Sequence, residues 1–515
     1  MVKSVALNVA LIMEEHKARV SGLAERVKEF YNEKVPFRLY HGNTNSTRPS
    51  VRTLAHSLDV SQMNHVLSVD VQNKTCLVEP NVPMDALFDA TIKYNLVAPV
   101  TPEFPAITVG GAFAGTAGES SSFRYGFFDA TVNWCTVILA DGRVVKASKT
   151  ENADLFEGLK GTFGTLGVGV LFEVKLIQAT KFVELSYHPV SDSISHAKEL
   201  IEEACLRPAG EVDFVDGIMF GKSTGVIITG RLSDSNEKGL PIVTFHKAWD
   251  QWYYLHAEKQ MQESLRKTTS SNEKSLSICS RELVPLRSYL FRYDRGAFWT
   301  GRYAYAYFIT PFNRLTRYVL DPLLHTKTCY HALHRSGLSE QFIIQDMALP
   351  WLNVEKFWDW LDEKIELYPQ WLCPLFASGA GGGLNPHHDL DSNLNGKSGL
   401  ILNIGVWGPL PLGDAVTVNR SIESQLMKLR GMKWLYAEAF YEPEEFWSIY
   451  QKKTYDTLRT KYNAGTLPDV YTKVGNSRSN RGKALTGAWS IWPLAGIYGV
   501  LSCIKGGDYL RKSKG

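Results

Sequence analysis

Glycines and hydroxyl residues are concentrated in one short stretch of this chain. Residues 108–126, TVGGAFAGTAGESSSFRYG, contain five glycines and three consecutive serines. Glycine lets backbone N–H groups approach a ligand closely, and Ser and Thr hydroxyls add hydrogen-bond donors with little bulk. A solvated surface loop would explain the same composition. The stretch therefore predicts either an ordinary glycine-rich loop or a loop that closes on a phosphate-bearing ligand.

Two further stretches of the same kind lie in the first third of the chain. They are HGNTNSTR at 41–48 and GTFGTLGVG at 161–169. Successive N–H groups in such turns form nests that hold anions. The sequence has neither the GK[ST] ending of a P-loop nor the strand, GxGxxG and helix of a Rossmann fingerprint. Together the three stretches predict a dinucleotide that is held by loops rather than at one helix end.

The composition excludes several other classes of protein. The chain has 515 residues, enough for two or three domains, and its net charge of +3 gives no reason to expect a nucleic-acid partner. Seven scattered cysteines form no CxxC pair, which predicts neither a zinc site nor a disulfide framework and fits a reducing compartment. His387, His388 and Asp389 invite a metal site, but no further ligand cluster accompanies them. We expect a solvated loop there and no bound metal.

Hydrophobic periodicity divides the chain into two α+β regions. The first begins with a helix at 14–33 and closes near Gln178, and the second runs from about 180 to 447. Other predicted segments are strands at 37–40 and 75–79, a helix at 84–95, hairpins at 141–142 and 222–225, a mobile loop at 262–274, a loop at 377–399 and a strand at 433–441.

Residues 484–504, ALTGAWSIWPLAGIYGVLSCI, carry no charge. As one helix they would span about 31 Å, close to the thickness of a bilayer core. Trp489, Trp492 and Tyr498 are candidates for the membrane interface, and a basic segment follows. Pro493 and several small or polar residues favour instead a loop and a helix packed on the body of the protein. A C-terminal membrane segment, spanning or interfacial, and a packed helix both stay open.

These features resemble the FAD-binding domain of the vanillyl-alcohol-oxidase/PCMH flavoproteins. Within that group the chain is similar to the Δ24-sterol reductases, the Diminuto/24-dehydrocholesterol-reductase family, from about residue 35 to residue 475. The resemblance rests on ordered matches along the chain: VEPNVPMDAL, PVTPEFPAITVGG, GTAGESSSFRYGFF, VILADGRVVKASKTENADLF, FVDGIMF, FIIQDMALP, YPQWLCPL, NIGVWG and LYAEAFYEPEEFW.

The resemblance implies an α+β fold of two domains. An FAD-binding domain at 14–178 would be followed by a substrate-binding cap with an antiparallel sheet at 180–447 and by a return to the FAD domain at 448–475. Residues 108–120 would contact the FAD pyrophosphate, with 41–48 opposite. The implied cofactor-binding residues are Gly42, Asn43, Thr44, Asn45, Ser46, Thr47, Thr108, Val109, Gly110, Gly111, Ala112, Phe113, Ala114, Gly115, Thr116, Ala117, Gly118, Glu119, Ser120, Gly161, Thr165 and Gly167.

The resemblance also implies an activity, the reduction of an isolated sterol alkene with NADPH as the electron donor. Protonation at carbon 24 would leave positive charge at carbon 25, which would take a hydride from reduced flavin. Some relatives attach FAD through a histidine on the loop that holds His41, but the sterol reductases do not depend on such a link. We therefore expect non-covalent FAD.

Protonation of an alkene requires an acid in an apolar pocket, where burial keeps the proton on a carboxyl group. Glu438 is the candidate donor and Tyr436 the candidate orienting residue, with Asp346 as another candidate acid. Trp407 and Tyr441 are expected to wall the sterol. All five residues would equally serve as ordinary core residues.

Arg124 leaves two interpretations open, since it could face the flavin or pair with a carboxylate such as Asp129. The alternative activities are a flavin oxidase or dehydrogenase, an ene-reductase acting on a non-sterol alkene, and a non-catalytic protein that retains FAD. Family members in animals and plants begin with a long hydrophobic membrane segment, and we expect none here before the matched region. The expected location is intracellular, at the endoplasmic-reticulum membrane or in the cytoplasm.

Overall fold

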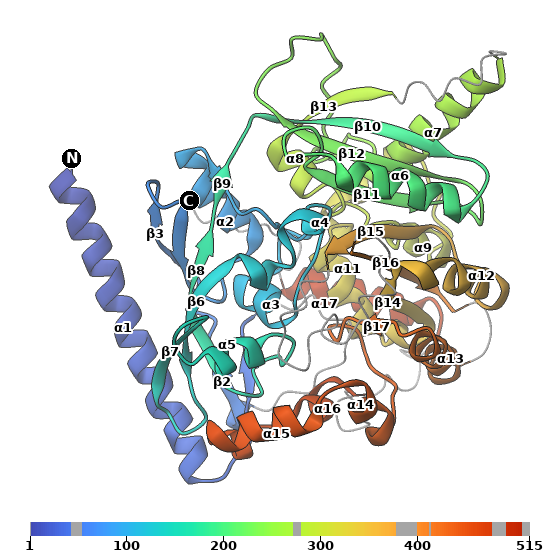
Figure 1. The fold of residues 1–515 in the computed structure, drawn as a ribbon. Coiled ribbons are helices and arrows are strands. Elements are labelled where there is room, and N and C mark those ends of the chain that lie inside the picture. The colour runs from blue at the N-terminus through green and yellow to red at the C-terminus, as the bar shows by residue number, and fades with distance from the viewer. Residues whose placement is uncertain are drawn as a thin grey trace.

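The computed structural model describes residues 2–42, 54–270, 280–376, 399–410, 414–475 and 491–506. It confirms the α+β fold with two domains, each built on its own antiparallel sheet (Figure 1). The sheet of the first domain has the order β3-β4-β8-β6-β7. Its strands are β3 (Val66–Asp70), β4 (Thr75–Val78), β6 (Val132–Ile138), β7 (Val144–Ser148) and β8 (Val168–Lys175).

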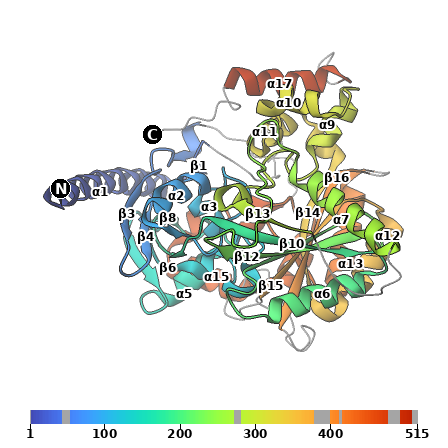
Figure 2. The same cartoon turned by 90° about the horizontal axis from the view of Figure 1, so that it is seen from above.

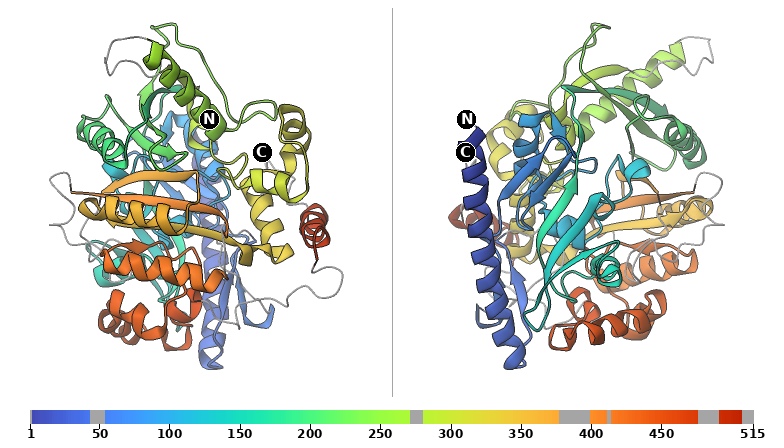
Figure 3. Two further views of the ribbon diagram at one scale, coloured as in Figure 1. Left: turned by 90° about the vertical axis from the view of Figure 1, so that its right-hand side faces the viewer. Right: turned by 60° about the vertical axis from the view of Figure 1, so that its left-hand side comes forward.

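Helices and short strand pairs surround this first sheet. The long helix α1 (Val2–Asn32) runs along its outer side and buries Val27 and Phe30 (Figures 1 and 3). The predicted hairpin is confirmed, since β6 and β7 are joined at Gly142 with φ +85°. The other elements are β1 (Arg38–Tyr40), β2 (Ser57–Asp59), α2 (Met84–Thr91), β5 (Leu96–Val97), α3 (Val109–Ala114), α4 (Ser122–Tyr125), α5 (Ala153–Leu159) and β9 (Ile177–Gln178).

The second domain is built on an eight-stranded sheet with the order β13-β10-β12-β11-β15-β16-β14-β17. Alternate residues of its strands supply two separate apolar cores, as expected for a sheet covered on both faces. The strands are β10 (Phe182–Val190), β11 (Phe214–Met219), β12 (Gly225–Ser233), β13 (Arg281–Pro285), β14 (Phe342–Pro350), β15 (Gln370–Phe376), β16 (Leu400–Pro409) and β17 (Met432–Lys433).

The two faces of this cap sheet meet different partners. One face packs against three helices, α6 (Ile194–Leu206), α12 (Val354–Lys364) and α13 (Ala415–Lys428), through residues such as Ile201, Phe357 and Leu426. The opposite face, which carries Trp371 and Trp407, belongs to the large core shared with the first domain. A ligand between the domains would therefore meet this second face.

Four helices form a lobe beside the cap sheet, which we call the helical lobe. They are α9 (Gly301–Tyr307), α10 (Arg314–Leu320), α11 (Thr326–Ser336) and α17 (Leu494–Gly506), and Figure 2 shows them together on one side of the molecule. The chain reaches them from the cap through α7 (Tyr253–Ser270) and α8 (Leu286–Leu290).

The chain then returns to the first domain through α14 (Pro443–Ile449), α15 (Lys452–Lys461) and α16 (Val470–Val474). The Tyr455 hydroxyl donates a hydrogen bond to Oγ1 of Thr165 at 2.8 Å, and Arg459 donates to the Thr165 carbonyl at 2.9 Å. These contacts tie the C-terminal segment to the third glycine-rich stretch. The boundaries 14–178, 180–447 and 448–475 stay predictions.

Two local predictions were wrong. Residues 262–270 of the predicted mobile loop continue the helix α7, because Tyr253, Tyr254, Ala257 and Met261 recur at helical spacing and are buried. The predicted strand at 433–441 is limited to β17, after which the chain turns. Residues 271–274 and 377–398 lie outside the described part of the chain.

The structure describes only part of the segment 484–504, for which a membrane segment and a packed helix were both left open. Residues 494–504 lie in α17, while 484–490 fall outside the described residues. Within the parts of the chain that the structure describes, no helix has the length and apolarity needed to cross a membrane.

Candidate functional site

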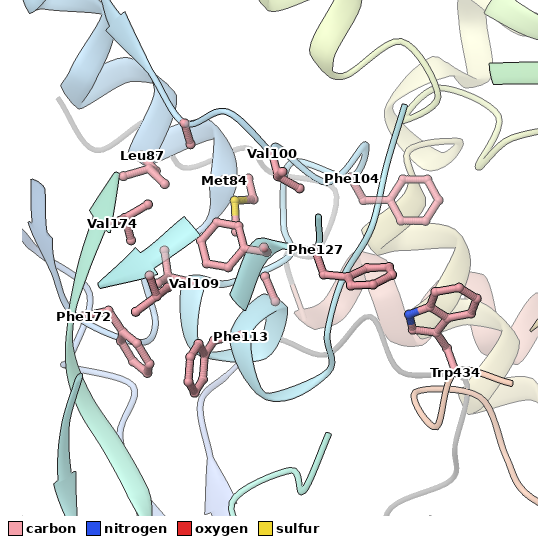
Figure 4. Packing of buried hydrophobic residues seen from close by; sticks show 14 of the residues in the cluster. Met84, Leu87, Val100, Phe104, Val109, Phe113, Phe127, Phe172, Val174 and Trp434 are labelled. Carbon is pink, nitrogen blue, oxygen red and sulfur yellow. The ribbon is translucent and has the colours of Figure 1, made fainter. Parts of the chain in front are cut away.

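A cavity lies between the glycine-rich stretch of the first domain and the face of the cap sheet that carries Trp371 and Trp407. The stretch begins at α3, where the Thr108 hydroxyl accepts a hydrogen bond from the Gly111 N–H at 3.3 Å. Behind the cavity, Val109 and Phe113 pack on β8, with the Phe113 and Phe172 rings 5.1 Å apart (Figure 4). The nine residues of the stretch on the cavity are Thr108, Gly110, Gly111, Ala112, Phe113, Ala114, Gly115, Ala117 and Gly118.

Close packing explains why these nine residues include so many glycines. A Cβ at Gly110 would lie 2.8 Å from Cβ of Pro80, and one at Gly115 would lie 2.9 Å from the Gly111 carbonyl oxygen. At Gly118 it would lie 3.0 Å from the Phe127 ring. The backbone itself is therefore the surface of the cavity here. We call these nine residues the glycine wall.

The other two glycine-rich stretches reach the same cavity only in part. His41 lines it, whereas Gly42 lies beside the cavity and Asn43, Thr44, Asn45, Ser46 and Thr47 lie outside the described residues. From the third stretch Gly164, Gly167, Val168 and Gly169 contribute. Gly161 and Thr165 lie away from the cavity, and Thr165 is held by Tyr455.

Four predicted cofactor residues make contacts within the protein, away from the cavity. Val109 is buried beneath the wall, and the Thr116 carbonyl accepts a hydrogen bond from the Trp434 indole at 2.9 Å. The Glu119 carboxyl accepts hydrogen bonds from the hydroxyls of Ser120, at 2.6 Å, and Ser121. These contacts fix the turn that follows the glycine wall, and they do not face the cavity.

The residues of the cavity fit FAD. A wall of bare backbone allows a flat or phosphate-bearing ligand to approach closely. The lining also holds buried polar atoms that have no hydrogen-bond partner among the described residues, namely Asn81 Oδ1, Glu103 Oε1, Tyr330 hydroxyl and Asn403 Oδ1. Such atoms normally find a partner, so they point to a ligand that brings its own polar groups.

Opposite the glycine wall, the cap sheet presents an acid. Asp346 on β14 accepts hydrogen bonds from Asn403 Nδ2 at 2.9 Å and from the Tyr436 hydroxyl. Burial raises the pKa of Asp346, although hydrogen bonds from Tyr436, Asn403 and Trp407 act in the lowering direction. Gly405 lies opposite Asp346 in the sheet, and a Cβ there would lie 2.7 Å from the Asp346 Oδ1.

Aromatic rings surround this acid. The Trp407 ring lies 4.9 Å from Phe298, 5.9 Å from Phe104 and 6.3 Å from Tyr330, measured between centroids. All four side chains line the cavity. The predicted substrate residue Trp407 is thus on the cavity, whereas Tyr441 packs on Phe446 away from it. We call Phe104, Phe298, Tyr330, Trp407 and the acid group Asp346–Tyr436 the cap wall.

The cavity holds a second buried acid that no pattern in the sequence predicts. Glu103, from the segment TPEFPA before the glycine wall, is only 6% exposed and lines the cavity. Burial raises the pKa of Glu103 well above its usual value, and the nearby carboxyls of Glu119 and Asp216 raise it further, against Arg292. The only signal in the sequence is a single carboxylate among prolines and Phe104.

Glu438, the predicted proton donor, is half-buried and lies away from the cavity. Its backbone carbonyl accepts hydrogen bonds from Gln345 and Lys433, which holds the turn after β17. Both predictions for Arg124 were wrong, because its guanidinium donates to the carbonyls of Arg207 and Val212, each at 2.8 Å.

The structure tests the expected absence of a bound metal only for the residues that it describes. Among the described residues, no group of three His, Cys, Asp or Glu side chains is placed to hold a metal ion. His387, His388 and Asp389 lie outside those residues.

Comparison with known proteins agrees with this geometry. The FAD binding domain family matches residues 18–148. The Delta(24)-sterol reductase of Homo sapiens is 27% identical over 473 residues, covering 89% of this chain and 86% of that protein. The enzyme of Pisum sativum is 29% identical over 454 residues, with 82% and 76% covered. The Delta(24)-sterol reductase homolog of Caenorhabditis elegans is 28% identical over 488 residues, with 90% and 88% covered. These similarities indicate an FAD-dependent oxidoreductase that resembles the Δ24-sterol reductases along most of its length.

Proposed function

We propose that this protein reduces an isolated C=C bond, the Δ24 bond of a sterol side chain, with NADPH as the electron donor. The observation that carries the proposal is the opposition of the two walls, bare backbone on one side and aromatic rings with buried acids on the other. The aromatic rings suit a hydrocarbon ligand, and the acids supply the proton that an isolated alkene needs. The relatives in Homo sapiens and Pisum sativum are named for this activity, which agrees with the assignment.

The glycine wall, with Gly164 and Gly167, would hold FAD without a covalent link. When bound, FAD would supply the hydride that completes the reduction. The remaining chemistry belongs to the residues of the cavity, which must exclude water, hold the alkene and deliver one proton.

We assign the proton donor to Glu103 rather than to Glu438. Glu103 faces the cavity, and its Oε1 has no hydrogen-bond partner among the described residues. Burial raises the pKa of Glu103 and so favours the protonated carboxyl group, which would hold a proton at this oxygen. Glu438 has no comparable access to the cavity.

Asp346 stands in a different environment. Burial raises the pKa of Asp346, and the hydrogen bonds that Tyr436 and Asn403 donate to its two carboxyl oxygens oppose that rise. The described residues give Glu103 no such side-chain hydrogen bonds, so Asp346 is the better candidate for the charged member of the pair. We therefore assign Asp346 to opposing the positive charge that develops at carbon 25, with Tyr436 orienting it.

Anaerobic stopped-flow spectroscopy at the flavin absorption band tests the proposal. NADPH should bleach the flavin, and desmosterol added next should restore the colour, whereas cholesterol, whose side chain is saturated, should not. NADH in parallel would report the preferred donor. Absence of bleaching by either nicotinamide would refute the reductase assignment. Recovery with oxygen but not with desmosterol would instead support a flavin oxidase.

A further inference from the structure

Helix α17 has its large apolar side chains on the outside. Its buried residues are Ala495, Gly496, Gly499 and Cys503, which form one face packed on α11. A Cβ at Gly499 would lie 2.5 Å from the Ala332 carbonyl oxygen, so the two helices are in close contact. The exposed face carries Ile497, Tyr498, Leu501 and Ile504. A helix on the surface of a globular protein normally has the reverse pattern.

Helix α10 and the loop before it share this property. None of the seven residues of α10, all of them described, is buried. Val319 is 64% exposed, and Ile309, in the loop between α9 and α10, is 76% exposed. The described part of the chain exposes 21 large hydrophobic residues, and ten of them fall in 309–319 and 491–504. Such a concentration marks an interaction site rather than scattered surface residues.

The two segments belong to one side of the helical lobe. The Trp492 indole donates a hydrogen bond to the Tyr307 carbonyl at 2.7 Å, and the Gly496 N–H donates to the Tyr307 hydroxyl at 3.2 Å. Tyr307 ends α9, two residues before Ile309. Figure 2 shows α17 and α10 on the same protruding side, and Figure 3 shows α17 at the outer edge of the molecule. We call this side, formed by 309–319 and 491–504, the apolar surface.

The charge around the apolar surface is strongly biased. Residues 297–337 contain five Lys or Arg residues and one carboxylate, Asp321, which is paired with Arg295 at 2.6 Å. Residues 491–506 contain Lys505 and no acidic residue. These two segments therefore carry five more positive than negative charges, whereas the whole chain carries only three more. The surface is complementary to an apolar partner with a negatively charged rim.

We propose that the apolar surface binds a phospholipid bilayer that contains anionic lipids, with α17 and α10 lying in the headgroup–acyl boundary. The 13 residues of α17 make a helix of about 20 Å. That length is short of the roughly 30 Å of a hydrocarbon core, so α17 lies on the bilayer rather than across it. Trp492, Tyr318 and Tyr498 are exposed here, and these residue types favour the membrane interface.

The same lobe connects the apolar surface to the cavity. Helix α11 contacts α17 through Thr328, whose carbonyl lies 3.6 Å from the Cys503 sulfur, and it places Tyr330 on the cap wall. Phe298, just before α9, lines the cavity as well. Resting on the proposed function, we infer that the sterol reaches the cavity from the bilayer through this lobe. Membrane binding itself does not depend on the identity of the substrate.

Flotation of the purified, FAD-loaded protein with vesicles tests the binding. We expect it to float with vesicles of phosphatidylcholine and phosphatidylserine, less with phosphatidylcholine alone, and less at high salt. Leu501→Asp and Val319→Asp should each weaken binding by at least about tenfold, because a charge replaces a side chain that the bilayer would bury. Leu206→Asp is the matched control, since Leu206 is 70% exposed on α6, on the opposite side in Figure 2.

The other outcomes are decisive as well. Failure of the unaltered protein to float, or an equal loss in Leu206→Asp, would overturn the proposal. Sedimentation that shows a dimer which Leu501→Asp converts to a monomer would mean that a second copy covers the surface. An unchanged flavin spectrum and melting temperature would show that the variants are folded. Leu501→Asp should still reduce detergent-solubilised desmosterol, but it should reduce vesicle-embedded desmosterol more slowly than the unaltered protein does. If the unaltered protein reduces desmosterol in neither form, the result would count against the proposed function and not against membrane binding.

Discussion

The two walls of the cavity differ in composition, since one is mainly backbone and the other is mainly side chains. The glycine wall is backbone, supplied by one continuous segment, 108–118, whose shape is fixed by contacts with Pro80 and Phe127. The cap wall is made of side chains from the helical lobe, from two strands of the cap sheet, from the turn after β17 and from Phe104, and we group Glu103 with it because Glu103 precedes Phe104 on the cavity. A substitution in the glycine wall should therefore alter the binding of FAD, and a substitution in the cap wall should alter the rate of alkene reduction.

Glu103→Gln is expected to have the largest effect. Glutamine keeps the size of the side chain but cannot donate a proton, so alkene reduction should fall by about 100- to 10,000-fold. Flavin content and the rate of flavin reduction by NADPH should not change, since these depend on the other wall. Single-turnover recovery of the flavin colour with desmosterol measures the step.

Glu438→Gln is the matched control for that experiment and should reduce desmosterol at close to the original rate. The reverse result, a large loss in Glu438→Gln with little change in Glu103→Gln, would return the role of donor to Glu438.

Gly405→Ala tests the cap wall without replacing a polar side chain. The added methyl group would lie 2.7 Å from the Asp346 Oδ1, so the carboxyl group must move. Displacement of a catalytic group by about 1 Å can lower a rate by roughly 100-fold. We expect slower desmosterol reduction with normal flavin content. Gly221→Ala is the control, since its Cβ would meet nothing within 4 Å among the described residues.

Gly110→Ala tests the glycine wall. Its Cβ would lie 2.8 Å from Cβ of Pro80, and overpacking of this kind destabilises a protein by about 1–3 kcal/mol. The variant should be purified with less FAD and should melt at a lower temperature, and added FAD should restore part of both. Gly22→Ala, in open space on α1, should keep its FAD. If Gly110→Ala keeps its full FAD content but turns over slowly, the glycine wall affects catalysis, and the assignment of separate roles to the two walls is wrong.

The smallest expected effect is on the pH dependence of stability. Because burial raises the pKa of Glu103 above its unfolded value, the folded state binds a proton more tightly than the unfolded state does. The contribution of Glu103 to stability is complete below its unfolded pKa of about 4.3 and is lost as the pH rises toward the folded pKa.

Urea unfolding of the native protein and of Glu103→Gln over this pH range checks the sign. Stability of the native protein should fall relative to the variant by at most about 1.4 kcal/mol per pH unit, the value for one proton. Parallel pH profiles for the two proteins would show that Glu103 has an ordinary pKa.

The contrast between the walls also explains what the sequence could predict. The glycine wall is local, so glycine content and spacing pointed to Gly110, Gly111 and Gly115. A one-dimensional pattern cannot separate Thr108 on the cavity from Val109 behind it, so the sequence predicted the same role for both residues.

The cap wall depends on long-range contacts. Burial is the main cause of the raised pKa of Glu103, and the carboxyls of Glu119 and Asp216 raise it further. Glu438 was chosen because 433–441 looks like a strand, yet β17 ends at Lys433 and the alternation of side chains ends with it. Burial by distant segments is not encoded in local periodicity.

The contacts of the C-terminal segment with the third glycine-rich stretch can form only late in synthesis. Lys473 donates a hydrogen bond to the Phe163 carbonyl, and Tyr455 holds Thr165 from 290 positions further along the chain. At about 5–20 residues per second, a ribosome makes this turn at least about 15 s before it makes Tyr455. A nascent chain therefore carries the glycine wall and the turn at Phe163 and Thr165 well before the residues that hold this turn have been made.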